Sequence, residues 1–145
     1  SIEQTDREVI TAWDGKMYFK GEEPEKPLDD LKAEKRVEIN KARDAAEQGG
    51  FEYMDKIFDS DPVSCQRISC AAQSMAAIEV EEGEPEPVIV WTCQDNTTIP
   101  LTASRLQGLV VALAMHSNAC HQKASELKAQ VEAAETAEEL NQIVW

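Results

Sequence analysis

The chain has 145 residues, 42% of them hydrophobic and 29% charged, which suffices for one modest core or one domain with an appendage. Its 28 acidic and 14 basic residues give a net charge of -14, which opposes approach to a phosphate backbone, so we expect no nucleic acid partner. We also expect no membrane partner, because the longest apolar run, LVVALAM, is far shorter than the roughly eighteen residues of a spanning helix.

Two β-rich runs flank Asp14 and Gly15, so we predict a β-hairpin over residues 8–20. Asp-Gly is typical of a type I′ turn, in which both central residues have a positive φ angle. The next segment, GEEPEKP, carries two prolines and dense charge and is typical of a linker. We therefore expect residues 1–27 to form a hairpin appendage with its linker, and residues 28–145 to form an α+β domain.

Strong helix formers with opposite charges three and four residues apart predict a helix over residues 29–48. Gly49 and Gly50 end it, because a left-handed residue at a helix C-terminus is most favourable as glycine. We expect the helix to be half exposed, since its apolar stripe is thin and consists of Leu31, Ile39, Ala42 and Ala46.

Two short β-rich runs, at residues 51–54 and 56–58, predict a second and very small hairpin. Asp61 and Pro62 then supply a helix N-cap and a proline at the first helical position. The apolar face of this helix is expected to contain Cys65, Ile68, Ala72 and Met75. Beyond it, the acidic segment EVEEGEPEP is typical of a mobile linker.

The run VIVWTCQDNTTIPL is apolar on both alternations and has Asp95-Asn96 at its turn, so it predicts a hairpin covered on both faces. Thr102 is the expected N-cap of a long helix, with Leu101 packing on Leu106 across the cap. Thr136 and Glu139 match a capping box for a short last helix. The overall expectation is an α+β fold with small β-hairpins and three to four helices, including the long C-terminal one.

The long helix carries apolar or small residues in alternating steps of four and three, a pattern typical of a coiled-coil seam. At roughly thirty residues it would extend about 45 Å, longer than so small a core. It therefore requires a partner along its length, either the chain's own helices or a second copy. The seam comprises Leu106, Val110, Leu113, Ser117, Cys120, Ala124, Leu127, Val131 and Ala134, of which Leu106, Val110, Leu113, Leu127 and Val131 are the candidates for self-association.

Metal binding has little support in the sequence. His116 and Cys120 lie four residues apart on one helical face, and Cys65 and Cys70 are the cysteines that would complete a tetrahedral site. However, Cys65 and Cys70 are five apart on a predicted helix and point in different directions. Neither CxxC nor HxxxH occurs, so we expect buried, reduced thiols and no metal.

An enzyme built on a cysteine nucleophile, with His116 or His121 as its base, is the alternative from a different functional class. No glycine-rich turn or third catalytic group accompanies these residues, and the sequence contains no GxGxxG, P-loop, HExxH or GxSxG motif. We therefore expect no catalytic residues and no cofactor.

Aromatic side chains with a polar tip are enriched at protein interfaces, which makes Trp13, Tyr18 and Trp91 the candidate partner-binding residues. Their alternative role is packing in the core, which the apolar surroundings favour for Trp91 and Trp145. For Trp13 and Tyr18, on an isolated hairpin, the two roles are evenly balanced.

Four stretches of the chain form a specific combination: RVEINKARDAA, GFEYMDKIFDSDPVSCQRI, WTCQDNTTIPL and GLVVALAMHSNACHQKASELKAQVEAAETAEELNQIVW. Through them, over roughly residues 36–145, the chain resembles a family of small proteins encoded beside tail-fibre genes in tailed bacteriophages and phage-tail-like bacteriocins. Ile39, Arg43 and Asp44 match the family's helix; Phe58, Asp59, Asp61 and Pro62 match its turn; and Leu140, Ile143 and Trp145 match its ending. Relatives commonly have glycine at the position of Asp55, and aspartate adopts the left-handed conformation at modest cost.

The resemblance implies a non-enzymatic chaperone that assists folding, trimerisation or attachment of a tail fibre in the cytoplasm of the bacterial host. Its implied partner is the C-terminal receptor-binding region of the fibre, and homo-oligomerisation stays open. The alternative is a structural subunit retained in the tail particle. The family brings no catalytic or metal-binding residues to this chain.

Overall fold

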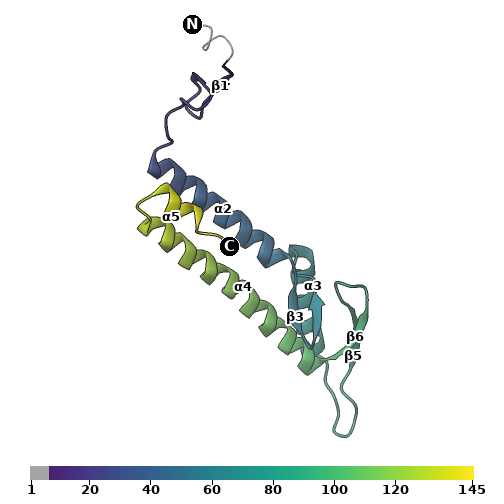
Figure 1. Cartoon of the computed structure of the whole chain (residues 1–145). Helices are drawn as coiled ribbons and strands as arrows, with labels where there is room; N and C mark the ends of the chain where they lie inside the picture. The colour runs from purple at the N-terminus through teal and green to yellow at the C-terminus, as the bar shows by residue number, and fades with distance from the viewer. Residues whose placement is uncertain (1–6) are drawn as a thin grey trace.

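The computed structural model describes residues 7–145. Within that range the fold is α+β, as the sequence predicts, with four helices and three separate two-stranded antiparallel sheets. Figure 1 shows α2 and α4 side by side, with the first hairpin beyond one end of the pair and α3 with the other hairpins at the opposite end. The elements are β1 (Val9–Thr11), β2 (Met17–Phe19), α2 (Leu28–Gln48), β3 (Phe51–Tyr53), β4 (Lys56–Phe58), α3 (Pro62–Ala76), β5 (Val88–Thr92), β6 (Thr98–Thr102), α4 (Ala103–Ala133) and α5 (Ala137–Asn141).

The hairpin of β1 and β2 is held by contacts within its own segment. Arg7 pairs with Glu22 at 2.6 Å and lies over the Phe19 ring, 4.7 Å from its centroid. The Trp13 indole N–H donates to the carbonyl of Pro24 at 3.0 Å. Residues 1–6 of the expected appendage lie outside the described range.

The predicted type I′ turn of this hairpin was wrong. Gly15 has a φ of 79°, but Asp14 does not have a positive φ. The N–H of Gly15 donates to Ala12, and the N–H of Ala12 donates to Lys16, which is a type I turn followed by a bulge. The Asp14 carboxylate accepts from the N–H of Lys16 at 3.0 Å, and this contact stabilises the turn with one left-handed residue instead of two.

The type I′ turn occurs instead between β3 and β4. Met54 and Asp55 have φ angles of 51° and 60°, so aspartate does occupy the left-handed position as expected. The β5–β6 hairpin repeats the turn of the first hairpin, with Asn96 at a φ of 66° and the Asp95 carboxylate accepting from the N–H of Thr97.

The chain forms two small hydrophobic clusters instead of one core. The first, between α3, the β3–β4 and β5–β6 hairpins and the start of α4, contains Phe51, Phe58, Ile68, Ala72, Met75, Trp91, Cys93, Leu101, Leu106 and Leu109. The second, between α2, the far half of α4 and the C-terminus, contains Ile39, Ala124, Val131, Ala134, Leu140 and Ile143. Because α4 has 31 residues, it is long enough to contribute to both.

The predicted helix starts are confirmed by their capping contacts. Asp61 accepts from the N–H of Ser64 and Thr102 from that of Arg105. Thr136 accepts from the N–H of Glu139, whose own carboxylate accepts from the N–H of Glu135 at 2.7 Å.

The β5–β6 hairpin is covered on one face only, so the expectation of two covered faces was wrong. Trp91, Cys93 and Leu101 are buried in the first cluster. The opposite face remains exposed, at 54% for Val88 and 67% for Val90. In the part of the chain that the structure describes, no third strand joins this sheet.

Candidate functional site

A polar junction joins the end of α2 to the middle of α4, between the two hydrophobic clusters. The His116 Nε2 lies 3.0 Å from the carbonyl of Ala46 and 3.3 Å from that of Glu47. Carbonyls only accept, so this nitrogen carries the hydrogen. The Ser60 hydroxyl also donates to the Glu47 carbonyl, at 2.6 Å. His116 and Ser60 thereby donate to carbonyls at the C-terminal end of α2, where the Ala46 carbonyl also accepts from the N–H of Gly49 at 3.4 Å.

The Glu47 side chain completes the junction. Its carboxylate accepts from the Ser117 hydroxyl at 3.0 Å and lies 2.8 Å from the Nε2 of His121. Ser117 was expected on an apolar seam, but its hydroxyl links α4 to α2 through this hydrogen bond to Glu47.

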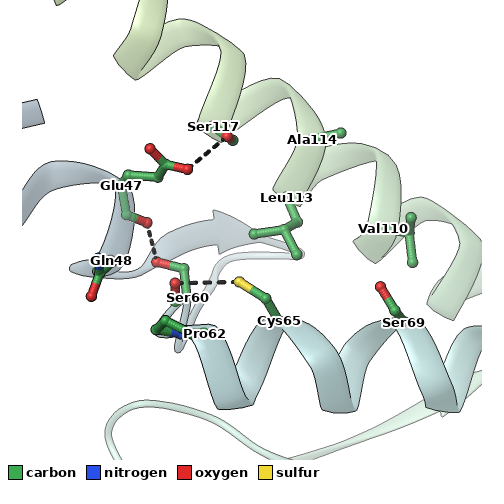
Figure 2. Close-up of a pocket in the computed structure, with 10 residues that line it drawn as sticks. All are labelled: Glu47, Gln48, Ser60, Pro62, Cys65, Ser69, Val110, Leu113, Ala114 and Ser117. Carbon is green, nitrogen blue, oxygen red and sulfur yellow. Dashed lines mark hydrogen bonds between the residues drawn. The ribbon is translucent and has the colours of Figure 1, made fainter. Parts of the chain in front are cut away.

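An open pocket of about 380 Å³ lies beside the junction. Figure 2 shows it between α4 and α3, with the end of α2 closing one side. It combines polar groups near Glu47 with the apolar side chains of α4. The pocket is lined by Glu47, Gln48, Ser60, Pro62, Cys65, Ser69, Val110, Leu113, Ala114 and Ser117.

The thiol in this pocket is not activated for nucleophilic attack. Burial raises the pKa of Cys65, and the nearby carboxylates of Asp61 and Glu47 raise it further. Its S–H donates to the carbonyl of Ser60 at 3.3 Å. A thiolate is the reactive form of cysteine, so these conditions keep Cys65 neutral and unreactive.

The structure does bring His116 and Cys120 together, with 3.9 Å between Nε2 and Sγ. That nitrogen carries a hydrogen directed at the carbonyls of α2, so it has no lone pair to accept the thiol proton. Burial also raises the pKa of Cys120. The pair therefore lacks the arrangement of a nucleophile and its base.

The four groups considered as metal ligands do not converge. Cys65 points into the pocket, Cys70 is exposed on α3, and Cys120 is buried on α4. Within residues 7–145, no three His, Cys, Asp or Glu side chains form a group able to hold a metal ion.

The three candidate aromatic residues have different surroundings. Trp91 is 7% exposed, and the Arg67 guanidinium lies 5.0 Å from its ring centroid. Trp91 therefore packs in the core and is not part of an open surface. Tyr18 is half-buried, and its hydroxyl donates to Asp14 at 2.9 Å. Trp13 is 46% exposed and is the one of the three with a largely accessible ring.

The seam of α4 is used inside the chain. Leu106 and Val131 are fully buried, whereas Val110, Leu113 and Leu127 are partly buried against the two clusters. The buried part of the seam is thus covered by the chain's own elements, whereas Val110 and Leu113 also line the open pocket. Self-association through this seam stays a prediction. The exposed apolar residues of α4 lie on the opposite face, at 57% for Val111 and 69% for Met115. This exposed pair was not predicted from the sequence, although its spacing of four residues was a detectable signal.

A family model described as a domain of unknown function (DUF4376) matches residues 30–144. The chain belongs to the DUF4376 family. The DUF4376 segment begins in the first turn of α2, so it includes both hydrophobic clusters and excludes the β1–β2 hairpin. No curated protein and no solved structure matches the chain. Across residues 7–145, this DUF4376 protein has no helix that is both long and apolar enough to cross a membrane.

Proposed function

We propose that this protein is a non-enzymatic chaperone that assists folding, trimerisation or attachment of a phage or tailocin tail fibre. It would act in the cytoplasm of the bacterial host and bind the C-terminal receptor-binding region of the fibre. The resemblance to proteins encoded beside tail-fibre genes supports the tail fibre as the client.

The observation that carries the proposal is a set of apolar side chains exposed on three separate elements of a strongly acidic chain. They are Trp13 and Met17 on the first hairpin, Val88 and Val90 on β5, and Val111 and Met115 on α4. Exposed apolar groups are typical of surfaces that bind other proteins. The net charge of -14 would keep such a chain soluble while it holds a partly folded client.

Co-expression with the neighbouring fibre tests this function. We expect more soluble trimeric fibre than from the fibre alone, measured by size-exclusion chromatography with light scattering. Replacing Trp13 and Met17 by serine should reduce the gain, whereas the matched control Lys20→Ala on the same hairpin should keep it. An unchanged yield with the wild-type chain would contradict the proposal.

Proteomics of purified particles separates the chaperone from a structural subunit retained in the tail. A chaperone should be absent from the particle or present well below the amount of fibre. Stoichiometric retention would favour the structural role.

A further inference from the structure

We propose that the outer edge of β5 binds an extended segment of a partner polypeptide as an added antiparallel strand. The segment would carry apolar residues along its length and lysine or arginine at its C-terminal end. This inference rests on the proposed function for the identity of the client, since it names the chemistry of the client segment.

The hydrogen bonds of the β5–β6 hairpin leave this edge without a partner. The N–H of Cys93 donates to the carbonyl of Thr97 at 2.7 Å, so these two residues form a hydrogen-bonded pair. Along an antiparallel ladder, hydrogen-bonded pairs alternate with pairs that share no hydrogen bond. Val90 pairs with Pro100, and Val88 with Thr102, as non-bonded pairs. Their main-chain N–H and C=O groups therefore point away from β6.

Within residues 7–145, no third strand joins this sheet, and no main-chain hydrogen bond outside it reaches Val88 or Val90. At the turn end of β5, the N–H of Gln94 donates to the carbonyl of Ile57 at 2.9 Å. The accessible part of the edge is therefore the half that contains Val88 and Val90.

The opposite edge of the hairpin is closed to strand addition at its centre. Pro100 has no N–H, and its carbonyl accepts from the Arg105 guanidinium at 3.4 Å. Proline on an edge strand is a common device against unwanted pairing. Because β6 has this protection and β5 does not, the structure directs an added strand to β5.

The exposed face of the hairpin carries no charged side chain. Val88, Val90 and Thr92 on β5 lie across from Thr102, Pro100 and Thr98 on β6. An antiparallel sheet with one solvated face normally alternates apolar and polar residues, and exposed edges commonly carry lysine. Here the two valines would contact alternate side chains of an added strand, which is how strand addition gains specificity.

Charge complementarity selects the partner. The segment of residues 79–86, directly before β5, contains the five glutamates Glu79, Glu81, Glu82, Glu84 and Glu86. None of them belongs to a salt bridge formed within residues 7–145. A basic segment would be attracted to these glutamates. A second copy of this chain also has a net charge of -14 and would be repelled.

The direction of β5 fixes the position of the basic residues. The glutamates precede Val88, so they lie at the N-terminal end of β5. An antiparallel strand has its C-terminal end there, and antiparallel pairing is the more stable arrangement. The lysines or arginines of the partner are therefore expected at the C-terminal end of its strand.

A peptide titration tests the proposal with the full chain. The probe is a peptide of alternating valine and threonine that ends in a run of lysines, and its matched control ends in glutamates. We expect the lysine peptide to shift the amide NMR signals of Val88 and Val90, and added salt to weaken binding. Binding of the two peptides with equal affinity would overturn the charge argument.

Two proline variants test the edge itself. Val90→Pro removes an outward N–H of β5, and Thr98→Pro removes an outward N–H of β6, so neither breaks a bond between the strands. We expect Val90→Pro to weaken binding about tenfold or more and Thr98→Pro to leave it unchanged. Thermal unfolding followed by circular dichroism checks that both variants fold. Val90→Lys, which keeps the N–H and repels the basic probe, replaces Val90→Pro if that variant unfolds.

Equal weakening by the two proline variants would overturn the proposal. A concentration-dependent dimer that Val90→Pro abolishes would also overturn it, because the edge would then serve a second copy. The titration contains no fibre, so its failure leaves the co-expression test of chaperone function intact. Conversely, peptide binding without any effect on fibre yield would refute the fibre as the client and retain the edge site.

Discussion

The Tyr53 hydroxyl on β3 donates a 2.9 Å hydrogen bond to the carbonyl of Arg105 on α4. The same side chain lies against Gly108, where an added Cβ would overlap the hydroxyl and lie 3.0 Å from Cζ. Glycine is unfavourable inside a helix, so its presence at this position of α4 reflects the close approach of Tyr53. This contact fixes the smallest hairpin against the longest helix.

Gly108→Ala should therefore destabilise the protein, although alanine is the better helix former. Overpacking against Tyr53 outweighs the gain in helix propensity, and we expect a net loss of roughly 1–2 kcal/mol in the free energy of unfolding. Chemical denaturation measures this loss. The matched control Asn118→Ala, on the exposed face of the same helix, should change stability by less than about 0.5 kcal/mol. An increase in stability for Gly108→Ala would contradict the close packing of Tyr53 against Gly108.

His116→Phe should preserve the ring that stacks on Phe51 while removing the donor to the end of α2. The ring centroids of His116 and Phe51 are 6.0 Å apart. Loss of the hydrogen bond to the Ala46 carbonyl should cost about 1 kcal/mol of unfolding free energy. His121→Ala, which removes an exposed pair with Glu47, should cost less than about 0.5 kcal/mol. Equal losses for the two variants would argue against a capping role for His116.

The N-cap of α3 should make part of the stability dependent on acid pH. Hydrogen bonds from the Ser64 hydroxyl and then from the Ser64 N–H lower the pKa of Asp61 below 3.8. A carboxyl with a lowered pKa stabilises the fold above its unfolded value and loses that contribution as the pH falls through its folded value. Melting temperatures measured from pH 7 down to below 3.8 should therefore fall more steeply for the wild type than for Asp61→Asn. Parallel curves would contradict the role of this carboxylate.

The four cysteines should react at different rates with a neutral alkylating agent. Cys70 is exposed, whereas burial raises the pKa values of Cys65, Cys93 and Cys120. Cys70 should be modified first and the buried Cys93 and Cys120 last, as followed by mass spectrometry of peptides. Unfolding in denaturant should equalise the rates. Preferential labelling of Cys65 or Cys120 in the folded protein would reveal an activated thiol and revive the enzyme hypothesis.

Removal of residues 1–25 should leave the remaining fold intact. This deletion keeps Lys26, which pairs with Glu34, and Pro27, whose carbonyl accepts the first hydrogen bonds of α2. The hairpin makes its main side-chain contacts within residues 7–24, and neither hydrophobic cluster contains any of its residues. We expect the unfolding free energy of the shortened chain to stay within about 0.5 kcal/mol of the full chain. Loss of cooperative unfolding would show that the domain boundary before α2 is misplaced.

Local patterns in the sequence were sufficient for most element boundaries. Asp61-Pro62 and Thr102 predicted helix starts because capping depends on residues within one turn. The small β3–β4 hairpin was also predictable, since its turn involves only adjacent residues. The type of the first turn was not predictable, because Asp-Gly permits both a type I′ turn and a type I turn with a bulge. The hydrogen bond from the N–H of Lys16 to the Asp14 carboxylate favours the second.

The sequence by itself determined the helices, the hairpins, the acidic charge and the membership of residues 30–144 in one family. Only the tertiary structure decided which surfaces are covered. Periodicity shows that Leu106 and Val131 lie on one helical face, but not whether α2, α3 or another chain covers that face. The same holds for Val88 and Val90, whose exposure depends on the placement of segments far away in the sequence. Burial is a property of the assembled chain, and local patterns cannot specify it.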